Sequence, residues 1–502
     1  WSSDVCSSDL GLLAEYAHLP LLEASLNNQA MNSHAVRTHG RRGSRRPMQL
    51  AGRGLATDYA RALLASLGVP VGTSDGPEDM EPWRAWARSG LMTLTGHADG
   101  PAQMCPVPLA SCADGALKAL HCIASAIRTS AARLPAGAAL LGERAAIAGL
   151  HRHGAIAPGG GCRLLRAADG WFAISLTREA DWSDVPAWLE DDHVRSWEVI
   201  IAAVATRDAA TLVERARLLG LAACLSAPPM TSPKPWYIAT RHGTRAPTGK
   251  RLDPPKVVDL SSLWAGPLCS HLLQQCGARV VKIESPERPD GARSGPPAFF
   301  DLMNHGKRSV ALTFDARGIA RLHELLDWAD IVIESSRPRG LRQLGVSAEQ
   351  CIARRSGLTW ISITGYGRDE PESQWTAFGD DAGVAAGLSS LMQQMIGQPL
   401  ICGDAIADPL TGLHAALAAL VSYQSGGGRL IALALRDVVA QGIGFARPAR
   451  DPDLIERWHT WTAEARKHGL DTTPPVARPV AGPARALGAD NDTAPADWSD
   501  PC

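Results

Sequence analysis

Two adjacent carboxylates, Asp380 and Asp381 in "TAFGDDAGVAAGL", could do chemistry because they stand where a helix is expected to begin. The unpaired N–H groups and the dipole of a helix N-terminus stabilise negative charge, so a carboxylate placed there stays ionised. An ionised carboxylate can attack an acyl carbonyl and form a mixed anhydride. The same residues could instead cap the helix, and the chemistry alone favours this second interpretation.

Groups that could stabilise an oxyanion or bind phosphate occur elsewhere in the chain. The run Gly159-Gly160-Gly161 could supply backbone N–H donors, because glycine lets the backbone turn and approach closely. Arg293 and Arg337 follow apolar runs and could hold phosphate by bidentate contacts. Their spacing alone fits exposed surface charges equally well.

Two polar residues near position 410 are interpreted from their neighbours. Asp408, followed by Pro409, is predicted to be the N-cap of a helix over 409–421, with the proline in its first turn. His414 lies on this alanine-rich helix and is predicted to be a buried core histidine rather than a catalyst.

The elements that must position these groups alternate between strand and helix in the C-terminal half. Strands are expected at Val257–Leu260, Val280–Ile283, Ser309–Thr313, Ile331–Glu334 and Leu358–Ile363. Strands that are apolar throughout and separated by helices predict an α/β fold with a parallel, doubly wound sheet, which binds ligands at the carboxyl ends of its strands. No G-x-G-x-x-G follows the first strand, so the fingerprint of nicotinamide or flavin binding is absent.

A proline-rich segment over 226–255 is predicted to be a linker, because proline removes backbone donors and disfavours helix in the residue before it. We expect 49–225 and 256–440 to fold on its two sides. A C-terminal segment over 441–502 follows, and its end is interpreted as truncated.

The first residues are expected to lie outside the fold. Residues 1–10, "WSSDVCSSDL", are similar to a translated sequencing adaptor, and we interpret them as an artefact. Residues 11–48 include the basic tract "RTHGRRGSRRPMQ", which we expect to be unfolded.

Composition excludes several classes of protein. The 50 basic and 51 acidic residues give a net charge of -1, which indicates neither a nucleic-acid partner nor an anionic membrane surface. The 11 cysteines form no C-x-x-C pair, which favours reduced thiols in the cytoplasm over disulfides or a metal site. No apolar run approaches the roughly 18 residues of a membrane span, and "WEVIIAAVA" is predicted to be a core helix.

Five blocks in the C-terminal half resemble, in order, the successive blocks of the family III CoA-transferases. They are "VVDLSSLWAGPLCSHLLQQCGARVVKIESPERPDGAR", "NHGKRSVALTF", "ADIVIESSRPRGLRQLG", "LTWISITGYG" and "GDAIADPLTGLHAALAAL". The family includes the carnitine, formyl and oxalate CoA-transferase type and α-methylacyl-CoA racemase. The resemblance covers about 257–440.

The resemblance implies a Rossmann-like sheet with a small α+β domain, and transfer of CoA from an acyl-CoA to a carboxylic acid. Asp380 would be the nucleophile, with Asp381 as the alternative, through an aspartyl anhydride and an aspartyl-CoA thioester. CoA would be a substrate, and no permanently bound cofactor or metal is expected. Asp404 matches a Gly-Asp step of the family, for which structural and active-site roles are both open. The residues implied to contact CoA are Ala265, Gly266, Pro267, Lys282, Glu284, Arg293 and Arg337, with Gly159, Gly160 and Gly161 in the glycine loop.

The segment 89–120 repeats the segment 386–417 at a constant offset, which predicts an internal duplication. The first copy, within 49–225, holds Trp83 and Arg84 where the second holds its carboxylates, so we expect it to be degenerate. Members of the family form interlinked dimers. A chain with two copies would therefore be a pseudo-dimeric monomer with one working site, and a homodimer is the alternative.

Two other functions stay open. Isomerisation of a 2-methylacyl-CoA needs an acid and a base on opposite faces of the α-carbon, and 361–379 lacks the histidine of the racemase branch. A non-catalytic CoA-binding protein is the other alternative. The acyl group itself is not identified, because few aromatic residues flank the predicted nucleophile in the sequence.

Overall fold

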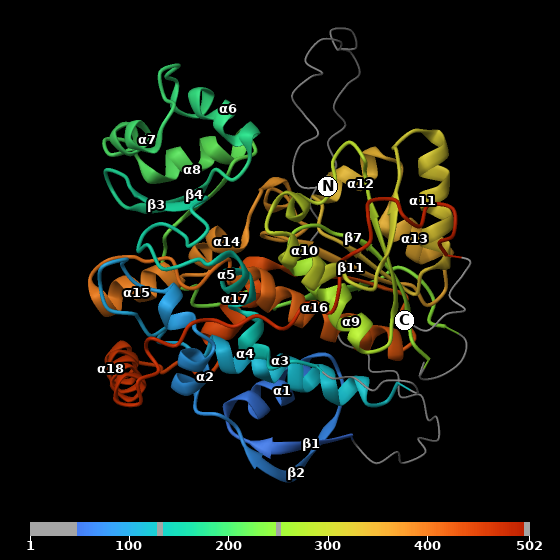
Figure 1. The fold of residues 1–502 in the computed structure, drawn as a ribbon, viewed down its shortest axis with the longest axis horizontal. Helices are drawn as coiled ribbons and strands as arrows, with labels where there is room; N and C mark the ends of the chain where they lie inside the picture. Colours follow the sequence, from blue (N-terminus) through green and yellow to red (C-terminus); the bar gives the residue numbers. More distant parts are fainter. Residues whose placement is uncertain (1–47, 128–133, 247–252, 496–502) are drawn as a thin grey trace, which may run out of the picture.

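The computed structural model describes residues 48–127, 134–246 and 253–495 and arranges them around one large and two small sheets (Figure 1). The interpreted artefact over 1–10, and 11–48 except its last residue, lie outside the described residues.

The large sheet has seven strands in the order β6-β12-β11-β10-β7-β8-β9. The strands are β6 (Ile238–Arg241), β7 (Lys256–Leu260), β8 (Arg279–Glu284), β9 (Arg308–Ala311), β10 (Ile331–Glu334), β11 (Thr359–Thr364) and β12 (Arg429–Ala434). All neighbours pair in parallel except β6, which runs antiparallel to β12. The predicted parallel, doubly wound sheet is confirmed. Its strand order reverses between β7 and β10, which is where such a sheet opens a crevice for ligands.

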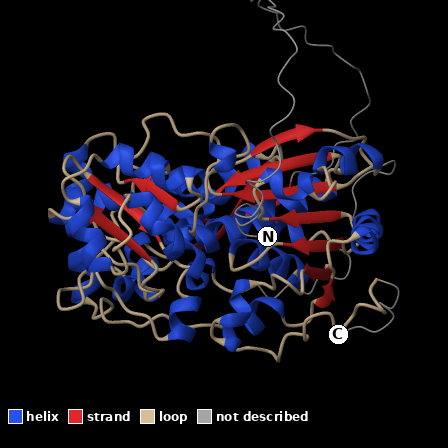
Figure 2. Cartoon of the chain, turned by 90° about the horizontal axis from the view of Figure 1, so that it is seen from above, coloured by secondary structure: helices blue, strands red, loops and turns tan. Residues whose placement is uncertain are grey.

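Helices cover both faces of this sheet (Figure 2). Successive strand residues point to opposite faces, so Val257 and Ile331 belong to one apolar core while Val258 and Val332 belong to another. The first core includes α9 (Ala265–Gln275) and α16 (Ala407–Gln424); the second includes α11 (Ala316–Trp328), α12 (Pro338–Gln343) and α13 (Ala348–Arg354). Burial on both faces explains why these strands are apolar throughout.

A smaller α+β domain stands beside the sheet (Figure 1). Its antiparallel strands are β3 (Cys162–Arg166), β4 (Trp171–Ser175) and β5 (Ala222–Leu225), and its helices are α6 (Glu179–Leu189), α7 (Trp197–Val204) and α8 (Ala209–Leu218). The sequence "WEVIIAAVA" forms α7, but Val199 and Ile201 are 41% and 47% exposed. The prediction of a core helix holds for one side of α7 only, where Ile200 and Val204 are buried in the domain core.

The N-terminal part begins with a parallel β-α-β unit and continues with helices. The elements are β1 (Met48–Arg53), α1 (Leu55–Ser66), β2 (Val71–Glu78), α2 (Pro82–Arg88), α3 (Leu109–Ala124), α4 (Gly137–Leu140) and α5 (Glu143–Ala148). α2 stands at the predicted offset before α14 (Gly379–Ala385), and α3 packs on α16. This order of elements supports the duplication, which stays a proposal.

Two segments outside these units join distant parts of the chain. The predicted linker over 226–255 contains β6, which completes the edge of the large sheet. After α15 (Leu388–Ile396), α17 (Leu435–Gly444) and α18 (Asp451–Lys467), the C-terminal segment returns to β9, where Asp490 accepts hydrogen bonds from Arg308 at 2.8 Å and from the backbone N–H of Ser309 at 2.8 Å.

Candidate functional site

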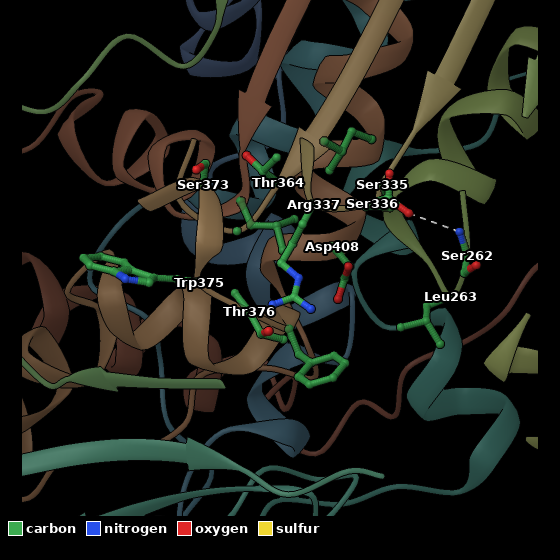
Figure 3. A pocket seen from close by; sticks show the side chains of 16 residues that line it. Ser262, Leu263, Ser335, Ser336, Arg337, Thr364, Ser373, Trp375, Thr376 and Asp408 are labelled. Carbon is green, nitrogen blue, oxygen red and sulfur yellow. Dashed lines mark hydrogen bonds between the residues drawn. The ribbon is translucent and has the colours of Figure 1, made fainter. Parts of the chain in front are cut away.

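A cavity lies at the carboxyl ends of β7, β10 and β11, where the strand order reverses (Figure 3). We call it the strand-end cavity. Its wall includes Ser262, Leu263, Ala265, Ser335, Ser336, Arg337, Ile363, Thr364, Gly365, Ser373, Trp375, Thr376, Ala377, Phe378, Asp408 and Leu435. The backbone N–H of Ser262 donates to the Ser335 hydroxyl at 3.2 Å, so the turns after β7 and β10 are joined across the crevice. The cavity therefore stands where a doubly wound sheet binds its ligand.

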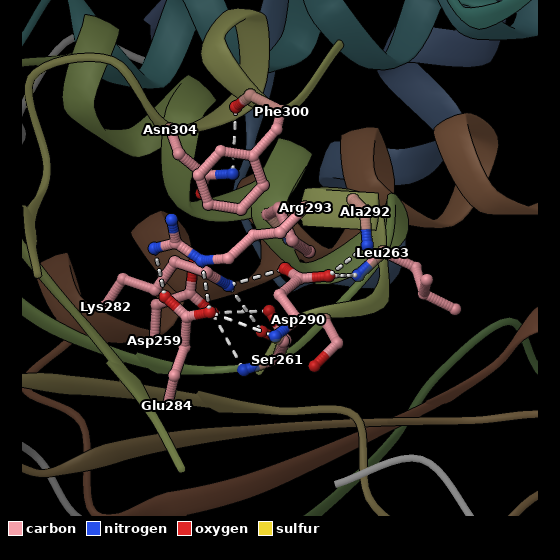
Figure 4. Close-up of polar contacts among 12 residues, drawn as sticks. Asp259, Ser261, Leu263, Lys282, Glu284, Asp290, Ala292, Arg293, Phe300 and Asn304 are labelled. Atoms are coloured by element: carbon pink, nitrogen blue, oxygen red, sulfur yellow. Dashed lines mark hydrogen bonds and ion pairs between the residues drawn. The ribbon is translucent and has the colours of Figure 1, made fainter. Parts of the chain in front are cut away.

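The turn that leads into α9 is stabilised by a buried ion pair between Lys282 and Asp290 (Figure 4). The Lys282 ammonium is 2.8 Å from the Asp290 carboxylate and donates to the Ser261 carbonyl at 2.8 Å. Asp290 in turn accepts from the N–H of Leu263 at 2.9 Å. Close packing also requires Gly266, because a Cβ there would collide with Ser261. Lys282 is buried and satisfied, so in this structure it shapes the turn.

Glu284 and Arg293 form a second pair in the same region (Figure 4). Arg293 donates to both carboxylate oxygens of Glu284, at 2.8 and 2.7 Å, and its guanidinium lies 4.2 Å from the centre of the Phe300 ring. A phosphate would have to compete with Glu284 for this guanidinium. The described wall of the strand-end cavity includes Ala265 and Arg337 but not Gly266, Pro267, Lys282, Glu284 or Arg293.

Arg337 is the cation of the strand-end cavity wall. It precedes Pro338, the first residue of α12, and its guanidinium points into the cavity on the same side as the Asp408 carboxylate (Figure 3). One of its nitrogens donates a long hydrogen bond of 3.4 Å to the carbonyl of Gln374.

We expect Arg337→Ala to weaken CoA binding by about 1–3 kcal/mol, roughly 5- to 150-fold in Kd, because a charge-assisted contact to phosphate would be lost. Isothermal calorimetry with CoA measures this change. Arg339→Ala is the matched control, since Arg339 lies two residues further along the chain, is exposed on α12 and lines no part of this cavity. An Arg337→Ala variant that binds CoA as tightly as Arg339→Ala would remove Arg337 from the site.

Three carboxylates gather around one arginine beside this cavity. We call Asp380, Asp404, Asp408 and Arg144 the carboxylate cluster. Arg144, on α5 of the N-terminal part, donates to both oxygens of the fully buried Asp404, with a distance of 2.9 Å from Nε to Oδ2. Asp380 accepts from the N–H of Ala405 at 2.7 Å. A residue of the N-terminal part and three residues of the C-terminal half therefore meet at one site.

Asp408 was predicted to be a helix N-cap, and this prediction was wrong. The helix α16 begins at Ala407, and the carboxylate of Asp408 faces the strand-end cavity, where the backbone N–H of Ala265 bonds to it (Figure 3). A Cβ on Gly379 would collide with this carboxylate, so the glycine before Asp380 makes room for it.

The pKa values of two carboxyl groups in the cluster are raised towards neutrality, and burial is the largest cause. Burial raises the pKa of Asp380 to about 6, with the Asp404 charge adding to the effect and Arg144 opposing it. Burial also raises the pKa of Asp408 to about 7; Arg144 opposes this shift, and the charges of Asp380 and Asp404 add to it. Carboxylates with such pKa values are typical of reactive sites.

Asp381 lies on the other side of the same helix turn. It is fully buried, and its Oδ1 accepts from the Ser175 hydroxyl at 2.9 Å and from the N–H of Phe378 at 2.9 Å. Burial raises its pKa to about 7. Asp381 is thus the residue that caps α14 and anchors it to β4.

A second cavity, the glycine-loop cavity, opens on the side of Asp380. Its wall consists of Arg144, Gly159, Gly160, Gly161, Cys162, Ser175, Leu176, Thr177, Trp182, Trp197, Phe378 and Asp380. Gly160 has φ of 79° and donates its N–H to the Ala157 carbonyl at 2.7 Å, so this predicted oxyanion donor is already used. Phe378 belongs to both walls, so the two cavities are adjacent, and the carboxylate cluster contributes Asp408 to one wall and Arg144 and Asp380 to the other.

Sequence reasoning missed three features of these cavities: Arg144, the orientation of Asp408, and the presence of Trp182 and Trp197 in the wall of the glycine-loop cavity. Arg144 follows a glutamate at the start of a short helix and has the pattern of an ordinary surface charge. Within the described ranges, no group of three or more His, Cys, Asp or Glu side chains is arranged to hold a metal ion. None of the helices described is long and apolar enough to cross a membrane.

Comparison with known proteins gives one family match and several relatives. Residues 252–450 match the model of CoA-transferase family III. The chain is 33% identical over 227 residues to a succinate–glutarate CoA-transferase of Agrobacterium fabrum, covering 41% of this chain and 57% of that protein. It is 31% identical to a human succinyl-CoA:glutarate CoA-transferase, covering 36% of this chain and 44% of that protein. A formyl-CoA:oxalate CoA-transferase of Rhodopseudomonas palustris is 31% identical, with 38% and 47% covered.

The chain thus spans about half the length of these curated relatives. Among solved structures, a CAIB/BAIF family protein from Brucella suis aligns with a TM-score of 0.36 at 26% identity, covering 46% of this chain and 60% of that one.

Proposed function

We propose that the chain transfers CoA from an acyl-CoA to a carboxylic acid, because residues 252–450 match the model of CoA-transferase family III. The observation that carries the proposal is the carboxylate cluster between two adjacent cavities, one of which occupies the switch point of the sheet. CoA would bind in the strand-end cavity, with Arg337 facing a phosphate and the thioester at the cluster. CoA is a substrate in this proposal, and no resident cofactor takes part.

The reaction needs one carboxylate to accept the acyl group and then CoA. A carboxylate oxygen attacks the thioester carbonyl, the C–S bond breaks, and CoA leaves as thiolate. The thiolate attacks the aspartyl carbonyl of the mixed anhydride and releases the donor acid. The acceptor carboxylate then attacks the aspartyl thioester, and the thiolate returns to the new acyl carbonyl, which frees the aspartate.

We assign the first attack to Asp408, which departs from the sequence-based choice of Asp380. Both carboxylates are half-buried, but only Asp408 belongs to the wall of the strand-end cavity. Asp380 faces the glycine-loop cavity, where the acyl group would lie. Asp381 caps its helix and is fully buried, so it takes no part in the proposed chemistry.

Trapping with hydroxylamine tests this mechanism. Incubation with an acyl-CoA and then hydroxylamine should convert one aspartate to a hydroxamate, because hydroxylamine attacks activated acyl groups and leaves free carboxylates unchanged. Asp380 and Asp408 fall between Arg368 and Arg429, so fragmentation of that tryptic peptide must locate the modified residue. A hydroxamate on Asp380 would restore the sequence-based choice. No hydroxamate with any acyl-CoA that binds would contradict covalent transfer.

One observation favours a second function, isomerisation of a 2-methylacyl-CoA. Asp380 and Asp408, with pKa values of about 6 and 7, line two adjacent cavities, so they could act as base and acid on an α-carbon held between them. Uptake of deuterium at the α-carbon in deuterated water, without hydroxamate formation, would favour this function. If a bound acyl-CoA shows neither reaction, the chain is a CoA-binding protein without catalysis.

A further inference from the structure

Three aromatic side chains line part of the glycine-loop cavity. Trp182 on α6 and Trp197 at the start of α7 stand edge to face, with ring centres 5.3 Å apart and planes at 82°. Phe378 closes the side towards the carboxylate cluster. Both tryptophans are half-buried, so their rings contribute both to the domain core and to the cavity wall.

Two of the three arginines around this cavity already hold carboxylates. Arg144 makes two hydrogen bonds to Asp404, and Arg178, whose guanidinium is 5.8 Å from the Phe378 ring centre, is paired with Asp181. Arg163 lies over the Trp197 ring at 4.3 Å. The charged groups in the wall itself are Arg144 and Asp380. A second carboxylate on an acyl group would therefore meet the Asp380 charge and an arginine that is already neutralised.

We propose that this cavity binds an uncharged acyl group that carries an aromatic ring, so that the substrates are an aryl-substituted acyl-CoA and the corresponding acid. The inference rests on the proposed function. Aromatic rings pair well in edge-to-face and offset arrangements, which Trp182, Trp197 and Phe378 offer on different sides of the cavity. Dicarboxylate acyl groups, named in several relatives, would be disfavoured by Asp380.

Binding of unreactive thioethers separates this inference from the catalytic proposal. We expect S-benzyl-CoA to bind about tenfold or more tightly than S-(2-carboxyethyl)-CoA by calorimetry with the full chain, because the ring would pack against Trp182 and Trp197 whereas the carboxylate would meet Asp380. Trp182→Ala and Trp197→Ala should each remove most of this preference and leave the affinity for CoA itself unchanged. Trp182→Phe should keep most of it. Trp461→Ala is the matched control, since Trp461 is a half-buried tryptophan on the distant helix α18.

The outcomes are distinct. Equal or tighter binding of the carboxyethyl thioether, or a preference that survives both alanine variants, would overturn the aromatic acyl site while leaving CoA transfer intact. Failure of CoA and of both thioethers to bind would overturn the proposed function and this inference together.

Discussion

Asp408→Asn is expected to lower the rate of CoA exchange on the order of 10⁴-fold or more, because an amide has no ionised oxygen to attack the thioester. The substitution keeps the size of the side chain, and its carbonyl oxygen can still accept the N–H of Ala265. The fold and CoA affinity should therefore persist. Exchange of labelled CoA between an acyl-CoA and the free pool measures the rate.

The dependence on pH gives a second readout of the same residue. Since the pKa of Asp408 is raised to about 7, the reactive ionised form is lost as the pH falls through that value, and the rate should fall with it. Asp380→Asn removes a negative charge that raises the pKa of Asp408, so it should move the profile to lower pH. Asp381→Asn is the control and should cost about 1 kcal/mol of stability through altered capping. Full activity of Asp408→Asn together with an inactive Asp380→Asn would reverse the assignment.

Arg478→Ala is expected to lower the free energy of unfolding by about 3–5 kcal/mol, because it leaves a buried carboxylate without its cation. The partner is Glu143 on α5, whose side chain is fully buried and accepts from Arg478 at 2.5 and 2.9 Å. The third nitrogen of the Arg478 guanidinium lies 2.9 Å from Nε2 of His271 on α9. The C-terminal segment is thereby fixed against the N-terminal part. The midpoint of denaturant unfolding, followed by circular dichroism, measures the loss.

The exposed pair Arg450 and Asp453 provides the control for this experiment. Their side chains are 75% and 38% exposed, so Arg450→Ala should change stability by about 0–1 kcal/mol. Replacing Glu143 by glutamine in the Arg478→Ala background should recover part of the loss, because the buried charge is then removed. A loss below about 1 kcal/mol for Arg478→Ala would show that Glu143 is held by other groups.

The sheet could be predicted from the sequence because strands that are buried on both faces are apolar along most of their length. The predicted run Ile331–Glu334 is β10, and the other four runs overlap β7, β8, β9 and β11 within two residues. Two strands were missed for physical reasons. β12 runs directly into α17 in "LIALALRDVV", so its apolar residues resemble the start of a helix, and every residue of β6 is exposed.

Predictions that depended on local sequence fared better than those that needed distant partners. His414 was predicted to be a core histidine, and this is confirmed, since it is buried with its Nε2 2.8 Å from the Tyr59 hydroxyl. Asp408 was misread because a carboxylate before a proline is also a good cap. The groups that actually surround Asp408 are the backbone of Ala265 on α9 and the guanidinium of Arg144, both far away in the chain. The pairs around Lys282 and Glu284 likewise depend on a loop conformation that spacing does not reveal.

The bond between Arg144 and Asp404 joins positions 260 residues apart. The chemistry of the cluster therefore depends on the N-terminal part of the chain, although that part supplies no reacting group. Loss of Arg144 would leave Asp404 as an uncompensated charge, and loss of Asp404 would leave the guanidinium beside two carboxylates of shifted pKa. Replacing either partner alone should therefore disturb the cluster more than replacing both together by uncharged residues, which makes the two positions one unit of constraint.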